Sequence, residues 1–341
     1  MKETMRMKLP VILIAIQSFL ISCSNSGPDK SIEDKIKIEN DLVYYGIAAT
    51  SIKLSINPAN SGIVENSIIS ENGKLINIYD DGYNGTLTFG NSYPADYFKS
   101  IKEKQVCNVK VRFPYTIKYN GKYYTFGWRY VNNVVEPSNI YLWSSLNGIE
   151  WEQENDGLPV LSSSSDPNSI WYYIWNVSVV VDDLDVFHLV AECAPNGKNQ
   201  QGVGLGYSSA KFENGKIDFN QNKTTTHIIK NGGNPYLYYS KSEKTLLVIH
   251  GMIYSNVNSL SSDYWWITAS YQNMKNKTWI TNPKKFSLGK NGIHVADPHA
   301  AVVEINGKYF TRLIFSYDQN YIYSIFFEND LDSFLKGLIY K

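Results

Sequence analysis

The sequence predicts an all-β protein that folds as a single five-bladed β-propeller. The first observation is a hairpin pattern, in which an alternating apolar run reaches an Asn-Gly pair and an aromatic run follows, as over 111–126. Asn and Gly supply the positive φ angles that a tight hairpin needs. The pattern recurs at intervals of about 50 to 65 residues, close to the length of one propeller blade. Aromatic residues make up 14% of the chain, which favours strands.

One hairpin is expected at the head of each blade. The Asn-Gly pairs are Asn72-Gly73, Asn120-Gly121 and Asn306-Gly307, while Asp182-Asp183 and Ser242-Glu243 provide the turns of the third and fourth hairpins. The blades are predicted over 65–101, 111–153, 175–220, 233–281 and 296–327. Apolar alternation over 42–56 precedes the first blade, and we expect this segment to supply the strand that closes the last one.

Two shorter segments have structural interpretations. Residues 144–151 resemble a shortened Asp-box turn, a structural feature between the outer strands of many propellers, so no chemistry is assigned to them. Residues 330–338 are expected to form one short helical turn, because no stretch of ten or more residues after the N-terminal segment shows a clear 3.6-residue apolar period.

Residues 1–22 are predicted to be a lipoprotein signal peptide. Basic residues precede an apolar segment over 9–21, which is too short to span a membrane comfortably as a helix. The segment ends Leu20-Ile21-Ser22-Cys23, which resembles the bacterial lipobox. That resemblance implies that Cys23 is acylated and becomes the first residue of the mature chain. The alternative is a plain secretory signal that contains a cysteine by chance.

Residues 23–41 are predicted to be a flexible tether, because this segment is polar and charged and contains Gly27-Pro28. The propeller would then span 42–341. Acyl chains on Cys23 would hold this domain at a membrane surface. We therefore expect a monomeric, membrane-anchored bacterial lipoprotein, with the periplasmic and the cell-surface face both left open by the residues after Cys23.

Composition excludes some partners and leaves others open. The formal net charge is zero, which gives no electrostatic reason to expect nucleic acid as a partner. Beyond Cys23 the chain has two cysteines, Cys107 and Cys193, for which a disulfide and two separate buried thiols are both compatible with the sequence. No ligand spacing indicates a metal site or a cofactor, although a Ca²⁺ ion on the central axis is compatible with this architecture.

Candidate site residues lie where a propeller brings distant segments together. The first strand of each blade starts on one face, and the second, antiparallel strand ends on the same face, so both sets of residues surround one funnel. Polar, charged, aromatic and histidine side chains occupy these positions: Glu65, Arg112, Trp175-Asn176, Asn234 and Asp297 at the starts, and Asp80-Asp81, Trp128, Arg129, Glu192 and His250 at the ends. His299 shares a face with Asp297. Such a ring suits a polar pocket of sugar size.

Three features resemble the five-bladed glycosidase superfamily, which includes the family 43 and fructosidase-type enzymes. They are the five blades, an Asp-Pro pair at the head of an inner strand and the hairpin strand 187–192. The resemblance covers about 65–327. It implies an acidic pair, since one carboxyl protonates the leaving oxygen while the other activates water or attacks. It implies Glu192 as the proton donor, with Asp297 and either Asp81 or Glu65 as base and modulator.

The chain also departs from that family. The head of the first blade holds Glu65-Asn66 and the head of the third holds Trp175-Asn176, where the family has aspartates. Each candidate has a plain structural interpretation. Glu192 would form a buried ion pair with Arg129 or Arg112, Asp297 would cap a turn, and His250 would be a hydrogen-bonded core residue.

The leading hypothesis is a surface-anchored glycoside hydrolase-like protein that acts on an oligo- or polysaccharide. In it the sugar is held by Arg112, Trp128, Arg129, Trp175, Asn234, His250 and His299. The alternative is a non-catalytic glycan-binding lipoprotein with a degenerate active site. Nothing specific in the sequence favours a third possibility, a propeller for protein interactions. The sugar, its linkage and the stereochemical outcome are left open.

Overall fold

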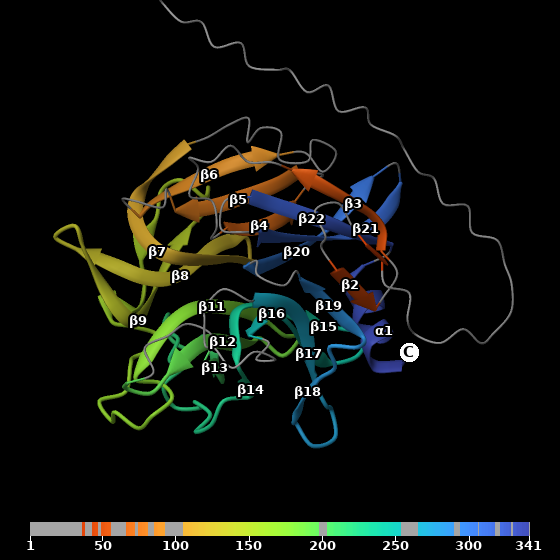
Figure 1. Ribbon diagram of the computed structural model, residues 1–341. Coiled ribbons are helices and arrows are strands. Elements are labelled where there is room, and N and C mark those ends of the chain that lie inside the picture. Colours follow the sequence, from red (N-terminus) through yellow and green to blue (C-terminus); the bar gives the residue numbers. More distant parts are fainter. Residues whose placement is uncertain are drawn as a thin grey trace, which may run out of the picture. The chain divides into compact units, whose positions relative to one another are not determined.

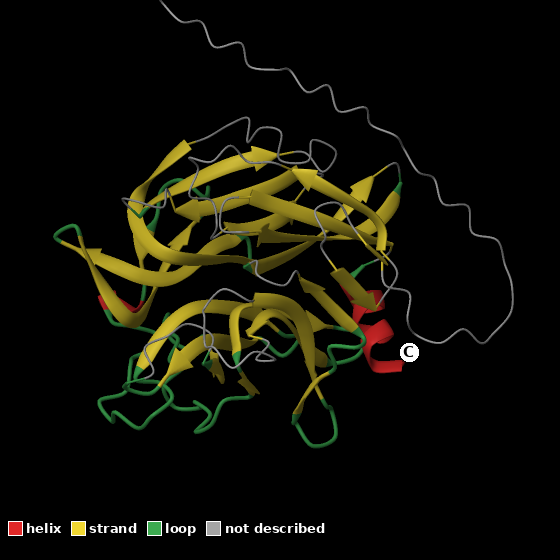
Figure 2. Cartoon of the chain, viewed as in Figure 1, coloured by secondary structure: helices red, strands yellow, loops and turns green. Residues whose placement is uncertain are grey.

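The computed structural model describes residues 36–37, 43–46, 49–55, 66–71, 74–80, 85–92, 105–197, 203–253, 265–289, 294–305, 307–317, 321–328 and 330–340. Over these residues the chain is β-structure in four hydrogen-bonded sheets, with one α-helix near the C-terminus (Figures 1 and 2). One of the four sheets contains two blades, so the predicted five-bladed propeller is confirmed. The predicted signal peptide and the adjacent Cys23 lie outside the described residues.

Blades I and II share one long strand. Blade I contains the antiparallel strands β4 (Asn66–Glu71), β5 (Lys74–Asp80) and β6 (Thr86–Ser92). Strand β7 (Gln105–Tyr119) pairs first with β6, and from Val111 onward with β8. This change of partner within one strand joins the two blades into a single seven-stranded sheet.

Blade II continues with β8 (Lys122–Val131), β9 (Val134–Ser145) and β10 (Glu152–Gln153). Its first hairpin has the predicted turn, because Asn120 and Gly121 have φ values of 47° and 78°. The turn after β9 is also structural, as predicted. There Oδ1 of Asn147 accepts backbone hydrogen bonds from Ile149 and Glu150, each 2.9 Å long.

Blades III and IV follow the same order. Blade III contains β11 (Tyr173–Val181), β12 (Val186–Ala194), β13 (Gly204–Lys211) and β14 (Ile229–Lys230). Blade IV contains β15 (Gly232–Ser240), β16 (Thr245–Ile253) and β17 (Trp265–Gln272), and β17 pairs with both β18 (Trp279–Thr281) and β19 (Phe286–Gly289).

Blade V is completed by a strand from the start of the chain. Strands β20 (Val295–Ile305), β21 (Lys308–Tyr317) and β22 (Tyr321–Glu328) form its first three strands. Strand β3 (Ala49–Ser55) pairs antiparallel with β22 and supplies the fourth, which confirms the predicted closure (Figure 1). The closing strand covers the edge that β22 would otherwise expose.

The N-terminal segment also reaches blade IV. Strand β2 (Val43–Gly46) pairs with β19, and β1 (Ile36–Lys37) pairs with β2. Ile36 and Lys37 lie inside the segment that the sequence predicts to be a tether, and they form strand β1. Consecutive pieces of one segment thus complete two neighbouring blades, β2 in blade IV and β3 in blade V.

The C-terminal helix α1 (Leu331–Tyr340) is longer than the single turn expected from the sequence. Leu331, Phe334, Leu335 and Leu338 are all buried, at the spacing of one helix face. Phe334 packs edge-on against Phe286 and Phe327, with ring centroids 5.2 and 5.1 Å apart. Within the described part of the chain, no helix is long and apolar enough to cross a membrane.

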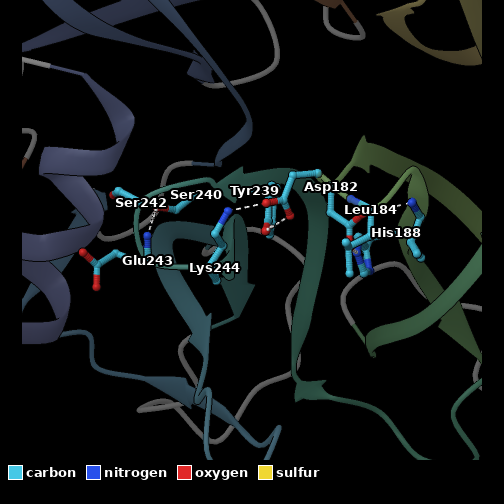
Figure 3. Close-up of polar contacts among 10 residues, drawn as sticks. Asp182, Leu184, His188, Tyr239, Ser240, Ser242, Glu243 and Lys244 are labelled. Carbon is cyan, nitrogen blue, oxygen red and sulfur yellow. Dashed lines mark hydrogen bonds and ion pairs between the residues drawn. The ribbon is translucent and has the colours of Figure 1, made fainter.

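Polar contacts join neighbouring blades. Ser67 of blade I and Ser178 of blade III each accept a 2.7 Å hydrogen bond from a backbone N–H in the inner strand of the next blade. At the hairpin tips of blades III and IV, Tyr239 donates a 2.6 Å hydrogen bond to Asp183, and Lys244 pairs with the same carboxylate (Figure 3). These contacts fix the positions of adjacent inner strands, which carry the candidate site.

Candidate functional site

The inner strands of blades II to V share an irregularity near the point where each begins to pair with the second strand of its blade. Each has a shift in pairing register, as between Arg112 and Tyr115 in β7 and between Ala296 and His299 in β20. The equivalent shifts occur in β11 between Ile174 and Val177, and in β15 between Gly233 and Tyr236. Bulges of this kind re-aim side chains and are frequent next to active sites.

Three of the four bulges have a further feature in common. Phe113, Asn234 and Asp297 each precede a proline and have positive φ values, of 55°, 48° and 51°. A positive φ is uncommon outside glycine, although Asn and Asp adopt it more readily than other residues. Proline is tolerated here because a bulge does not need the backbone N–H that proline lacks.

The four bulges line one pocket. The lining residues come from four different inner strands: Phe113, Pro114, Tyr115, Asn176, Val177, Asn234, Pro235, Asp297, Pro298 and His299. The strand starts therefore converge on a single hollow.

A chain of hydrogen bonds crosses three blades at this pocket. The side-chain amide of Asn176 donates to Glu192 at 3.0 Å and to Oδ1 of Asn234 at 2.7 Å. The side-chain amide of Asn234 donates to Asp297, and Ser316 donates to the other oxygen of Asp297 at 2.6 Å. Glu192 and Asp297 thus belong to one network that runs through two asparagines.

Among the described residues that line the pocket, Asp297 alone carries a carboxyl group. Burial raises its pKa to about 6, although the hydrogen bonds from Ser316 and Asn234 act in the opposite direction. A carboxyl group with this pKa exchanges its proton near neutral pH, as a general acid or base must.

Glu192 lies behind the pocket wall. Its side chain is fully buried and does not line the hollow. Its carboxylate accepts hydrogen bonds from the Asn176 side chain and, at 3.2 Å, from the backbone N–H of Asn234. In this position Glu192 orients the two asparagines, and its predicted role as proton donor stays a prediction.

His299 lies in the pocket between two tyrosines. Its ring is 5.5 Å from that of Tyr115 and 4.8 Å from that of Tyr236, measured between centroids. Burial lowers its pKa to about 3, so the imidazole is neutral at physiological pH. Neither ring nitrogen has a hydrogen-bond partner among the described residues. A neutral imidazole carries one donor and one acceptor, and both ring nitrogens of His299 are buried.

The predicted sugar contacts Arg112, Trp128 and Arg129 do not line the pocket. Arg112 forms an ion pair with Asp80 at 3.1 Å, and Trp128 donates a 3.0 Å hydrogen bond to the backbone oxygen of Ile174. Arg129 pairs with Glu136 at 2.8 Å. As the sequence indicates, Arg112 lies at the start of an inner strand, and it pairs with the end of the second strand, where Trp128 and Arg129 lie. The predicted roles of all three in sugar binding stay predictions.

The remaining candidates are dispersed. His250 is fully buried and contacts the Ser270 hydroxyl at 2.8 Å and the Gly251 carbonyl at 2.9 Å, as a core histidine would. Trp175 is partly buried beside the pocket residue Asn176 and stacks on Tyr173, with centroids 5.7 Å apart. Asp81 and Glu65 lie outside the described residues. Cys107 and Cys193 are both buried free thiols.

Several pocket residues have no place in the set predicted from the sequence, above all Phe113 and Tyr115. The repeated X-Pro pair near the start of an inner strand, in blades II, IV and V, is the signal that finds the bulges. No group of His, Cys, Asp or Glu side chains that could hold a metal ion occurs in the part of the chain that the structure describes.

At the level of sequence, no family model and no curated protein matches the chain. Comparison of structures does find similar proteins. One is a thermostable family 43 glycoside hydrolase, with a TM-score of 0.54 and 11% identity over 79% of this chain and 90% of that one. The chain has the five-bladed fold of these glycosidases.

Two arabinofuranosidases are similar to the same extent. The α-L-arabinofuranosidase from Lactobacillus brevis gives a TM-score of 0.54 and 9% identity, over 81% of this chain and 94% of that one. The catalytic domain of a family 62 α-L-arabinofuranosidase from Coprinopsis cinerea gives a TM-score of 0.53 and 11% identity, over 83% of this chain and 98% of that one. At these identities the likeness establishes the fold of this chain, and its function has to be argued from the pocket.

Proposed function

We propose that the protein binds a glycan and holds one of its sugar rings in the pocket at the inner strand starts. The observation that carries this proposal is the polar floor of the pocket, where Asn176, Asn234 and Asp297 are locked in place by hydrogen bonds beside the unpartnered imidazole of His299. Sugar hydroxyl groups donate and accept hydrogen bonds at the same time, and this floor offers both kinds of partner.

Hydrolysis of the glycan is the second candidate function, and one observation favours it. Asp297 has a pKa of about 6 and reaches the pocket, which suits a proton donor. Glycoside hydrolysis usually needs a second carboxyl group roughly 5 to 10 Å away on the other side of the sugar. Among the described residues Glu192 is the nearest acid in the network, and it is sealed behind the asparagines. Binding is therefore the better supported function.

The cellular setting is part of the proposal. Acylation of Cys23 would place the propeller on a bacterial membrane, as a monomer facing the periplasm or the cell surface, where glycans occur. The support is the segment that ends in Cys23. Mass spectrometry of the mature N-terminus tests this directly, and the variant Cys23→Ser should release the protein from membranes. A mature chain that begins elsewhere and carries no lipid would contradict the anchor.

Calorimetric titration of the mature protein with a panel of oligosaccharides tests the binding function. We expect at least one glycan to bind, and Asp297→Asn to weaken that binding about tenfold or more, about 1.4 kcal/mol. Glu304→Gln is a matched control, because Glu304 is exposed on the same strand, β20. The absence of binding across the panel would overturn the proposal.

A hydrolysis assay on the same panel separates the two functions. Release of reducing sugar by the parent protein, lost in Asp297→Asn and kept in Glu304→Gln, would favour the enzyme. Retained binding without turnover is the result that the buried position of Glu192 leads us to expect.

A further inference from the structure

We propose that Phe113 is the residue on which the bound sugar stacks, and that the ligand is a neutral sugar presenting an apolar C–H face to this ring. The inference rests on the proposed glycan-binding function and specifies which residue selects the sugar. Four observations carry it: the place of Phe113 in the blade pattern, its backbone conformation, the side chains that hold its ring, and the charge of the pocket.

Phe113 occupies the position in blade II that Asn234 holds in blade IV and Asp297 in blade V. All three are the first bulge residue of an inner strand, all precede a proline and all line the pocket. Two of the three side chains are polar and one is aromatic. Blade II therefore contributes an apolar wall of Phe113, Pro114 and Tyr115, while the polar groups come from blades III to V.

The backbone of Phe113 is unfavourable for its side chain. Its φ of 55° lies in the left-handed region, where a bulky residue is a genuine outlier and where Asn is several times more frequent. The following proline disfavours this conformation further. Strained residues persist where the surroundings dictate them, and they cluster at ligand sites. An asparagine would relieve the strain at this position, so the aromatic ring needs another reason to be there.

The ring of Phe113 is held by neighbours. Trp128 packs against it edge-to-face, with centroids 4.7 Å apart and an angle of 79° between the planes. The guanidinium group of Arg112 lies 4.6 Å from the ring centroid and is itself fixed by its ion pair with Asp80. Arg112 and Trp128, which the sequence suggests as sugar contacts, thus position the ring that lines the pocket. A ring fixed in advance loses little entropy when a ligand binds.

The charge of the pocket selects the class of sugar. Its described lining contains one acid, Asp297, one neutral imidazole and no lysine or arginine. The positive charge of Arg112 is compensated by Asp80. A sugar carboxylate would find no cationic partner among the described lining residues, and a buried charge without a partner is costly. A neutral ring pairs its C–H face with Phe113 and its hydroxyl groups with the asparagines and Asp297.

The test compares four variants by calorimetric titration and by urea unfolding. The probes are xylose, arabinose, galactose and glucose, as methyl glycosides and short oligosaccharides, together with galacturonate and glucuronate. Phe113→Asn introduces the residue of blade IV, Phe113→Trp keeps an aromatic face, and Phe113→Leu keeps apolar bulk without one. Phe212→Asn is the control, because Phe212 is a partly buried core residue that does not line the pocket.

We expect Phe113→Asn and Phe113→Leu to bind the best neutral glycan at least tenfold more weakly, and Phe113→Trp to bind within about threefold of the parent. Phe113→Asn should unfold at the same urea concentration as the parent or a higher one, because it relieves the strain. Phe212→Asn should show the reverse, with lower stability and unchanged affinity.

The outcomes separate the two proposals. If the parent binds no glycan, the proposed function fails and this inference falls with it. If the parent binds and both Phe113→Asn and Phe113→Leu bind equally well, only the role of Phe113 is overturned. A lower stability of Phe113→Asn with unchanged affinity would make Phe113 an ordinary packing residue. Preference for galacturonate over galactose would overturn the neutral class of sugar.

Discussion

The side-chain amide of Asn176 donates a 2.7 Å hydrogen bond to Oδ1 of Asn234, and this contact joins blade III to blade IV at the pocket. Each asparagine is also tied to a carboxylate, Asn176 to Glu192 and Asn234 to Asp297. The two amide groups therefore separate the two acids while connecting them. This arrangement makes the polar floor of the pocket sensitive to single changes of charge.

Replacing Asn234 by aspartate should be strongly destabilising. The variant Asn234→Asp would remove the donor to Asp297 and place a third carboxylate between it and Glu192. We expect a loss of about 2–4 kcal/mol in the free energy of unfolding at pH 7, since like charges at a buried site repel. Urea denaturation measures this loss. Asn214→Asp is the control, because Asn214 is exposed and also has a positive φ, 52°. Equal stability of the two variants would contradict the network.

Asp297 should give the protein a distinctive dependence of stability on pH. Its pKa of about 6 in the folded state lies above the usual value of about 3.9 for an unfolded chain. The folded state therefore binds the proton more tightly, and the stability that this provides is present below about pH 4. It is lost as the pH rises through 6, by no more than about 3 kcal/mol.

The difference between the parent protein and Asp297→Asn isolates this effect from that of other groups. Urea unfolding midpoints of both proteins should be compared between pH 4 and pH 7. The parent should lose stability relative to the variant as the pH rises. A difference that is constant over this range would show that Asp297 titrates normally.

Glu192 should matter for stability whatever its role toward a ligand. Truncation in Glu192→Ala leaves the amide of Asn176 and the backbone N–H of Asn234 without their buried acceptor. We expect a loss of about 2–4 kcal/mol. Glu192→Gln keeps an acceptor oxygen and should lose less. The same substitution to alanine at the exposed Glu213 should change stability by less than about 0.5 kcal/mol. If Glu192→Ala were as stable as the parent protein, Glu192 would not hold the network together.

The closing strand makes the fold depend on its N-terminal segment. A chain that begins at Val43 retains β2 and β3 and should give a folded, monomeric protein. A chain that begins at Ile56 lacks the partner of β22, so blade V would have an exposed edge. We expect aggregation or loss of the cooperative thermal transition in the shorter chain, measured by circular dichroism and size-exclusion chromatography. Equal behaviour of both chains would show that β3 is dispensable.

The fold could be predicted from the sequence because its signals are local and repeated. The Asn120-Gly121 turn and the spacing of the hairpins fix five blades, and the apolar alternation before Glu65 identifies the closing strand. The length of helix α1 could not be predicted, because its apolar face, Leu331 to Leu338, fits within ten residues and gives too short a period to detect.

The site could be predicted only in outline. The convergence of strand starts follows from propeller geometry, and Asp297, Asn234 and His299 follow from it. Which side chain actually reaches the pocket depends on the bulges, and a bulge shifts neighbouring residues between wall and interior. For this reason Arg112 and Trp128 lie next to the ring of Phe113 and not in the pocket. Neither the composition of the sequence nor its alternation of apolar residues predicts this difference.

The central claim is that a glycan occupies the hollow formed by the four bulges. A crystal structure of the protein with its best-binding oligosaccharide tests this most directly. We predict one sugar ring in the pocket, in hydrogen-bond contact with Asn176, Asp297 or His299 and against the ring of Phe113. A glycan bound on any other surface, with this pocket filled by water alone, would contradict the account.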